Sequence, residues 1–132
     1  MRPDSIAQVA ARAAEEACTF DPSVREFLDQ WQLMSPEQRT ARLEDEPQRL
    51  SGVKDAYLAA VAEHLALSER LPVPAWTEQP DRFLSEPFFA SGLESLKAIL
   101  LVESPLAFRR RLIFISADGL SRPRRQFLEE SA

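Results

Sequence analysis

The stretch SGVKDAYLAAVAEHLALSE, residues 51–69, decides the fold because it is the longest helical pattern in the chain. Alanine, leucine and glutamate, which favour helix, make up much of it. Gly52 marks a turn immediately before the helical pattern. The apolar positions recur at helical spacing, at Val53, Tyr57, Leu58, Val61, Ala62 and Leu65. We therefore predict one long helix here, from about residue 51 to 69.

Three shorter helices are predicted before this one, over residues 5–18, 22–33 and 36–44. Proline is tolerated at the first helical position, and a preceding serine or aspartate caps the helix. The pairs Asp21-Pro22 and Ser35-Pro36 therefore indicate helix starts. Ser35 is followed three residues later by Gln38, which completes the pattern of a capping box.

The character of the chain changes after residue 70. LPVPAWTEQP, residues 71–80, holds three prolines and is predicted to run extended along the surface, with Trp76 as an apolar plug. A strongly apolar helix is predicted over 93–103, and Ser104-Pro105 begins another that reaches about residue 111, with Phe108 directed inward. The residues near 112–116 are β-prone and form either a short extended piece or more helix.

The composition favours an all-α fold for the 132-residue chain. Only 3 glycines are present, whereas hairpin-rich β proteins need glycine at their tight turns. The length fits one domain with one core. We predict a single helical domain of about five to seven helices. Its parts are acidic N-terminal helices (1–50), a core segment (51–120) and a tail of mixed charge (121–132).

The N-terminus and the cysteine content favour a cytoplasmic protein. The first residues, MRPDSIAQVAARAAEEAC, lack the apolar run of a secretory signal, and no stretch approaches the roughly 18 apolar residues of a membrane span. The one cysteine, Cys18, cannot form an internal disulfide. It lies in a helical pattern, and we expect it to be buried as a small apolar side chain rather than to act as a reactive thiol.

Residues that carry catalytic or metal chemistry are sparse. The one histidine, His64, stands beside Glu63 in the long helical pattern, where adjacent side chains point about 100° apart and do not share a metal easily. The three glycines are isolated, so no phosphate-binding loop is present. We expect no catalytic residue, no cofactor, no metal and no enzyme activity. A hydrolase that uses His64 as its base is the weakest alternative.

The charge of the chain is uneven. Residues 1–104 carry 10 Lys and Arg against 18 Asp and Glu, while residues 105–132 carry six arginines against three carboxylates. Arg109, Arg110 and Arg111 form a triple arginine in a predicted helix. Three consecutive helical residues fan across about 200°, so at least one of these side chains must lie over the body of the protein. We expect Arg110 or Arg111 to form a structural clasp, by pairing with Glu63, Asp81 or Glu86 or by stacking on Trp76.

The arginines of the tail suggest an alternative function. Arg122, Arg124 and Arg125 lie in a proline-interrupted segment, where we expect them to be exposed. Together with the triple arginine they could neutralise phosphates, as in a nucleic-acid-binding regulator. No helix-turn-helix signature accompanies them, and the acidic body would repel DNA.

Three strings in the second half resemble a group of short bacterial proteins. They are AAVAEHLALSERLPVPAW (59–76), RFLSEPFF (82–89) and SLKAILLVESPLAFRRRLIFISADGLSR (95–122). Members of this group are often encoded beside nucleotidyltransferase-fold proteins of the kind that act as toxins in toxin–antitoxin pairs. Some members carry a helix-turn-helix domain ahead of the shared segment, where this chain has acidic helices instead. The resemblance implies an antitoxin-like or accessory binding role for this chain.

The aromatic residues between the long helix and the arginines are the candidate partner-binding set. It consists of Trp76, Phe83, Phe88 and Phe89, with Arg109 beside them. Exposed aromatic and arginine side chains are typical hot spots of protein interfaces. The alternative is that at least two of the four rings close the core beneath residues 71–80, the proline segment. The leading hypothesis is thus a non-enzymatic interaction module with a nucleotidyltransferase-like toxin as partner and an oligomeric state that stays open.

Overall fold

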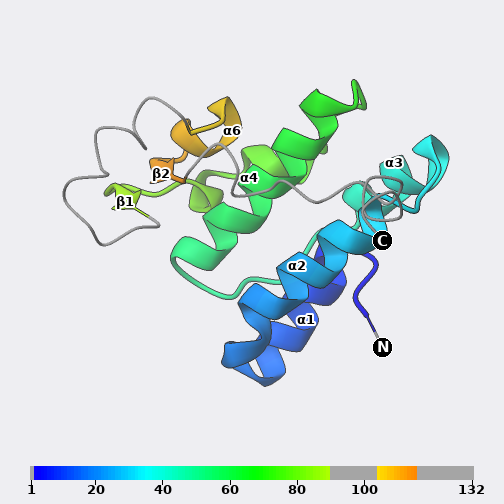
Figure 1. The fold of residues 1–132 in the computed structure, drawn as a ribbon. Coiled ribbons are helices and arrows are strands. Elements are labelled where there is room, and N and C mark those ends of the chain that lie inside the picture. The colour runs from blue at the N-terminus through cyan, green and yellow to red at the C-terminus, as the bar shows by residue number, and fades with distance from the viewer. Residues whose placement is uncertain (1, 90–103, 116–132) are drawn as a thin grey trace, which may run out of the picture.

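The computed structural model describes residues 2–89 and 104–115 and is mostly helical, which confirms the all-α prediction (Figure 1). The α-helices are α1 (Ile6–Glu15), α2 (Phe20–Trp31), α3 (Pro36–Glu44), α4 (Val53–Ser68) and α6 (Leu106–Arg109). Three 3₁₀ turns and two short strands complete the elements: η1 (Ala17–Thr19), η2 (Ala75–Glu78), η3 (Pro80–Arg82), β1 (Phe88–Phe89) and β2 (Ile113–Phe114). The helix predicted over 93–103 lies outside the described residues. No described helix is long and apolar enough to cross a membrane.

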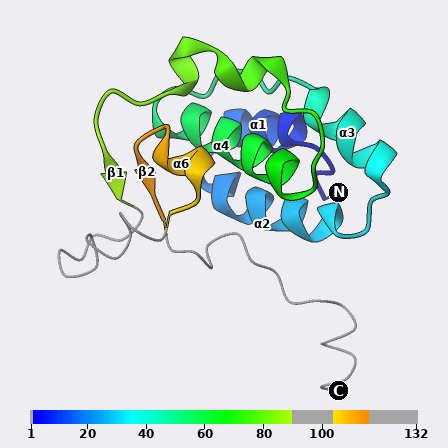
Figure 2. The same cartoon turned by 90° about the horizontal axis from the view of Figure 1, so that it is seen from above.

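The long helix α4 is the centre of the arrangement. In Figure 2, α2 lies on one side of α4 and the segment with η2 and η3 on the other, and α6 covers α4 beside β2. As a result α4 is buried on nearly all sides, and not along one stripe as its sequence pattern predicts. Its alanines, which let neighbouring backbones approach closely, are Ala56, Ala59, Ala60, Ala62 and Ala66, all fully buried.

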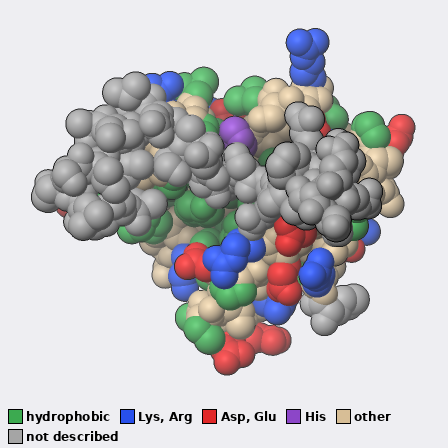
Figure 3. All heavy atoms as spheres, in the orientation of Figure 1, with side chains coloured by type: hydrophobic (Ala, Val, Ile, Leu, Met, Phe, Trp, Pro, Cys, Tyr) green, Lys and Arg blue, Asp and Glu red, His purple; other side chains and the backbone are tan. Residues whose placement is uncertain are grey.

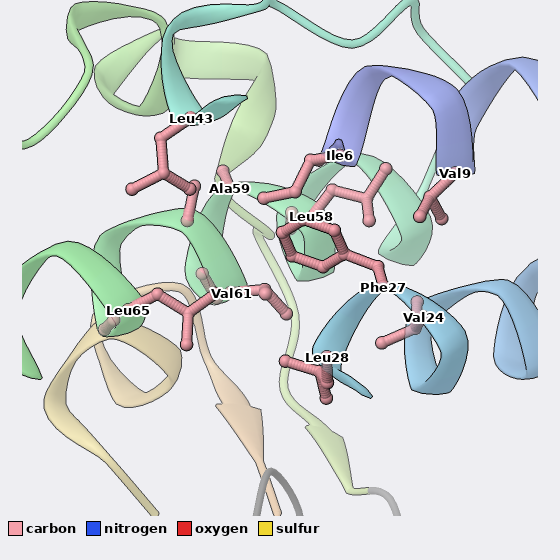
Figure 4. Close-up of a cluster of buried hydrophobic side chains, with 14 of the residues drawn as sticks. Ile6, Val9, Val24, Phe27, Leu28, Leu43, Leu58, Ala59, Val61 and Leu65 are labelled. Carbon is pink, nitrogen blue, oxygen red and sulfur yellow. The ribbon is translucent and has the colours of Figure 1, made fainter. Parts of the chain in front are cut away.

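The hydrophobic core joins α1, α2, α3 and α4. Figure 4 shows side chains from these helices pointing toward one another, with Ile6 of α1, Phe27 of α2 and Leu58 of α4 gathered at the centre. Leu43 is the single buried side chain of α3. Phe108 enters the same core from α6 and is completely buried, as the sequence predicts. Burial of such large apolar side chains is the main force that holds the helices together.

The first helix is shorter than predicted. It ends at Glu15, and the chain then forms η1 before α2 begins at Phe20. Cys18 falls in η1 and is exposed, so the expectation that it is buried is wrong. The 3₁₀ turn breaks the helical stripe, because three residues per turn instead of 3.6 rotate the following side chains away from the core.

The three proline pairs differ in how they act. Ser35-Pro36 starts α3 with a complete capping box, in which the Gln38 amide N–H donates to Ser35 Oγ at 3.2 Å. Asp21-Pro22 does not start a helix, because α2 begins one residue before Asp21 and has no side-chain cap. Ser104-Pro105 precedes α6, but the Ser104 hydroxyl does not cap it.

Ser104 instead closes the loop that carries α6 and β2. Its hydroxyl donates to the carbonyl oxygen of Ile115 and accepts from the amide N–H of Ile115, both at 2.9 Å. Within this loop, Leu112 adopts a positive φ of 63° and turns the chain from α6 into β2. β2 pairs in parallel with β1, so the β-prone residues near 112–116 do form a short extended piece.

The turn before α4 is held by a buried carboxylate. Ser51 and Gly52 both have positive φ, 88° and 65°, a conformation that side-chain-bearing residues such as serine adopt at a cost in strain. Asp55 in the first turn of α4 is 4% exposed and accepts from the amide N–H groups of Leu50 at 2.6 Å and Ser51 at 2.9 Å. The two bonds fix the sharp entry of the chain into α4.

We predict that Asp55→Asn lowers the free energy of unfolding by about 2 kcal/mol, because an amide side chain offers one acceptor oxygen to the two N–H donors of Leu50 and Ser51. The control is Asp45→Asn, at the exposed C-cap of α3, which should change stability by no more than about 0.5 kcal/mol. Urea denaturation of both variants measures the difference. Equal midpoints for the two variants would contradict this account of the turn.

Candidate interaction surface

Glu63 of α4 lies between two arginines of the C-terminal part of the described chain. Its two carboxylate oxygens accept from Arg111 Nη1 and Arg110 Nη1, each at 2.6 Å. Glu63 is 5% exposed and Arg111 is completely buried. Glu63 is among the carboxylates that the sequence analysis names for this contact. The geometry ties α6 to the middle of α4 by two charge-assisted hydrogen bonds.

Arg111 satisfies two backbone carbonyls as well as Glu63. Its guanidinium donates to the carbonyl oxygens of Ala107 at 2.8 Å and Thr77 at 2.7 Å. Thr77 lies in η2, so a single side chain links α4, α6 and the proline segment. The Nε of Arg111 is buried without a hydrogen-bond partner.

Arg110 sits at the edge of the same cluster. It is about one third exposed and forms a bidentate pair with Glu78 of η2, with Nη2 at 3.0 Å from Oε2. The hydrogen bond from Arg110 holds the pKa of the Glu78 carboxyl below its ordinary value, and the bonds to Glu78 and Glu63 raise the pKa of Arg110. Both groups are therefore charged at any physiological pH.

Phe83 lies beneath these two arginines. The guanidinium carbon of Arg111 is 4.4 Å from the centre of the Phe83 ring and that of Arg110 is 5.6 Å from it. Such cation–π contacts are stronger where water is excluded. The protein's own arginines thus pack on the ring, and Phe83 is half-buried and not an exposed member of the partner-binding set.

Trp76 also belongs to the interior. It is 5% exposed, and its indole N–H donates to the carbonyl oxygen of Leu43 at 2.9 Å. The residue that stacks on it is Arg82, 4.9 Å from the ring centre, and not an arginine of the triple. The expectation of an apolar plug is confirmed. The assignment of Trp76 as an exposed hot spot is wrong, because the 3₁₀ turn η2 directs the indole inward.

Arg82 is a structural residue that no local sequence pattern marks. It is completely buried and donates from Nη2 to the carbonyl oxygen of Pro47 at 2.7 Å. Burial, together with the nearby charge of Arg49, lowers the pKa of Arg82. An arginine two residues beyond a Gln-Pro pair carries no local signal of burial, so only the tertiary arrangement reveals this role.

Arg109 and the tail arginines differ from their neighbours. Arg109 is exposed and forms no ion pair with the described residues. Of the triple arginine, it is therefore the one whose side chain is available to a partner. The candidates for nucleic-acid contact, Arg122, Arg124 and Arg125, lie outside the described residues.

Phe88 is the one member of the aromatic set that the described structure leaves exposed, at 39%. It separates two open hollows that share Phe88 and Val53 as lining residues. The larger hollow has a volume of about 360 Å³ and is lined also by Phe20, Tyr57 and Ile115. The smaller has a volume of about 270 Å³ and extends toward Leu84 and Pro87. Phe89, beside it on β1, is half-buried and stacks on Phe114 at 5.0 Å.

The free charges on the described surface are mostly acidic. Some exposed carboxylates form no ion pair with the described residues: Glu15, Glu16, Asp21, Glu37, Glu44, Asp45 and Glu86. Fewer exposed arginines lack an ion pair with the described residues: Arg2, Arg25, Arg70 and Arg109. Figure 3 shows acidic side chains at the lower tip of the molecule, over the turn that joins α1 and α2.

His64 is half-buried and faces α6. Its ring meets the edge of Phe108 with 6.2 Å between ring centres. Burial lowers the pKa of the imidazole below its ordinary value of 6.5. Within residues 2–89 and 104–115, no three histidine, cysteine or carboxylate side chains lie close enough together to hold a metal ion.

Comparison with protein-family models, with curated proteins and with solved structures finds no match to this chain. The resemblance to antitoxin-like proteins therefore stays a prediction from the quoted strings.

We predict that Glu63→Gln lowers the free energy of unfolding by about 3–5 kcal/mol, because it leaves the buried Arg111 without a counter-charge. The matched control is Glu78→Gln, which removes the other carboxylate of Arg110 at an exposed position and should cost less than about 1 kcal/mol. Chemical denaturation gives both values. A loss for Glu63→Gln no larger than that of the control would show that the buried pair contributes little.

We predict a stability change that follows the titration of His64. Because the folded-state pKa is lowered, the unfolded chain binds the proton more tightly, and the free energy of unfolding falls as the pH drops from about 7.5 through about 6.5. The fall stops below the folded pKa. Since His64 is the one histidine of the chain, His64→Leu should flatten the curve in this range. Thermal unfolding of both proteins between about pH 5.5 and 7.5 measures the slope, and equal slopes would refute the assignment.

Proposed function

We propose that this protein is a non-enzymatic protein–protein interaction module, an antitoxin-like partner of a nucleotidyltransferase-type protein. The observation that carries the proposal is the balance of free charge on the surface. Two of the three consecutive arginines are turned toward Glu63 and Glu78, so within residues 2–89 and 104–115 the exposed charges without an ion pair are mainly carboxylates.

An acidic surface suits a partner whose own surface is basic. Nucleotidyltransferase-type proteins bind nucleotides or RNA, and a face that holds phosphates carries positive charge. Opposite charges on two proteins speed their encounter and exclude wrong partners. The resemblance of residues 59–76, 82–89 and 95–122 to proteins encoded beside such enzymes supports the same class of partner.

The described interior favours binding over catalysis. Glu63, the buried carboxylate beside His64, is neutralised by two arginines and serves as their anchor. A general base needs a free, accessible carboxylate or imidazole close to a substrate site. Both hollows at Phe88 are lined mainly by apolar side chains, which suit the apolar residues of another protein.

The arrangement of the arginines makes nucleic-acid binding the weaker alternative. Arg110 and Arg111 use their guanidinium groups for Glu63, Glu78 and backbone carbonyls, which leaves Arg109 as the free member of the triple. The triple arginine by itself would therefore contribute little to phosphate binding, because affinity grows with the number of phosphates neutralised. Arg122, Arg124 and Arg125, the other arginines of this alternative, lie outside the described residues.

We predict that co-expression with the product of the neighbouring gene gives a stable complex in size-exclusion chromatography and restores growth that this product alone arrests. Association should slow as salt is added, because counter-ions screen exposed charges. If the two proteins elute separately and growth stays arrested, the proposed function is wrong.

Charge variants test the electrostatic part of the proposal. Glu15→Lys with Glu16→Lys should slow association by about tenfold at low salt, while the reverse change, Arg25→Glu with Arg70→Glu, should not slow it. All four residues are exposed and form no ion pair with the described residues, so neither double variant breaks an internal contact. Equal slowing by the two double variants would contradict charge complementarity.

A further inference from the structure

We propose that the paired hollows at Phe88 form a docking site for a protein segment that carries two apolar side chains flanked by lysine or arginine. The inference rests on the proposed interaction function and assigns it a place on the molecule and a class of ligand. Phe88 and Val53 form the ridge between the hollows, and each hollow takes one apolar side chain.

The size and openness of the hollows favour side chains of a protein over a small molecule. Their volumes of about 360 and 270 Å³ lie, respectively, just above and just below the lower end of the range for pockets that enclose a drug-sized ligand. Both hollows open to solvent on either side of one exposed ring. A segment that straddles Phe88 would bury this ring and fill both hollows, in the manner of a central aromatic hot spot.

The larger hollow has a rigid aromatic wall. Phe20 of α2 packs edge-on against Tyr57 of α4 at 6.0 Å, and Tyr57 packs edge-on against Phe108 at 5.3 Å. The row of rings connects the hollow directly to the core of the protein. The wall is therefore pre-formed, and binding of a ligand does not carry the entropic cost of ordering these side chains.

The rims of the two hollows select for positive charge. Asp21 borders the larger hollow and Glu86 borders the smaller, and both are exposed without an ion pair in the described part of the chain. Lys54 also borders the larger hollow, but it is half-buried and its ammonium group lies over the Phe20 ring at 5.6 Å. The charges that face outward from the rims are thus carboxylates, which fit lysine or arginine on either side of the apolar anchors.

The test uses the full chain and a short synthetic helical peptide of leucine and lysine, in which leucines recur at i, i+3 and i+4. A second peptide with glutamate in place of lysine is the matched probe. Fluorescence anisotropy should show that the lysine peptide binds at least about tenfold more tightly than the glutamate peptide. Equal affinities would overturn the assigned ligand chemistry.

Protein variants then locate the site. Phe88→Ser should weaken binding of the lysine peptide by about tenfold or more. Leu33→Ser, which removes an apolar side chain that is 58% exposed just beyond the C-terminal end of α2, should leave affinity unchanged. Asp21→Asn with Glu86→Gln should weaken it by about threefold at low salt, and Glu37→Gln on α3 should not. Circular dichroism of each variant confirms that it is folded. Unchanged binding by folded Phe88→Ser would overturn the proposal.

Other occupants would give different results, and each would overturn the proposal. A dimer in sedimentation that Phe88→Ser dissociates would identify a second copy of this chain as the occupant. Peptide binding that appears only after the apolar residues of 93–102 are replaced by serine would identify that segment.

The same variants separate this inference from the proposed function. If Phe88→Ser leaves both the peptide and the nucleotidyltransferase-type protein bound as before, the site is wrong while the proposed function stands. If binding of the peptide depends on Phe88 but no complex with the nucleotidyltransferase-type protein forms, the site stands and the proposed partner is wrong.

Discussion

A carboxylate buried in the middle of the central helix constrains the rest of the structure. Glu63 on α4 is almost fully removed from water, and a charge in that position is tolerated only with a counter-charge and good hydrogen bonds. Arg110 and Arg111 supply both. Arg111 also donates to the carbonyl oxygen of Thr77, so this one cluster holds both the proline segment and α6 against α4.

Buried arginines and aromatic rings pack together on the side of α4 that is covered by the proline segment and α6. Arg111 covers Phe83, and Arg82 covers Trp76 while it holds a carbonyl oxygen near the end of α3. A guanidinium suits this role, since its flat faces pack on rings while its edges donate hydrogen bonds. In the part of the chain that the structure describes, Arg82, Arg110 and Arg111 are therefore used for internal contacts, and the exposed surface carries mainly unpaired carboxylates and the ring of Phe88.

The sequence predicts those features that depend on neighbours in the chain. The capping box at Ser35 and the inward direction of Phe108 follow from local spacing, and both are present. Features set by distant partners are missed: Ser104 bonds to Ile115 instead of capping α6, and Arg82 is buried. Cys18 is misplaced because a single 3₁₀ turn changes which face of the chain meets the core. At the candidate site, the sequence supplies the aromatic residues but not which ring remains exposed.

The long separation between Glu63 and its two arginines has a consequence for how the protein is made. A ribosome synthesises the chain from the N-terminus, so α4 is complete more than 40 residues before Arg110 and Arg111 emerge. Until then, the centre of α4 carries a carboxylate that a tightly packed interior would not accept. The N-terminal helices can associate early, but the side of α4 that holds Glu63 stays open to water until nearly all of the described chain has been made. Folding of this face is therefore completed late and after synthesis of α6, a window in which chaperones or a partner can meet the unfinished surface.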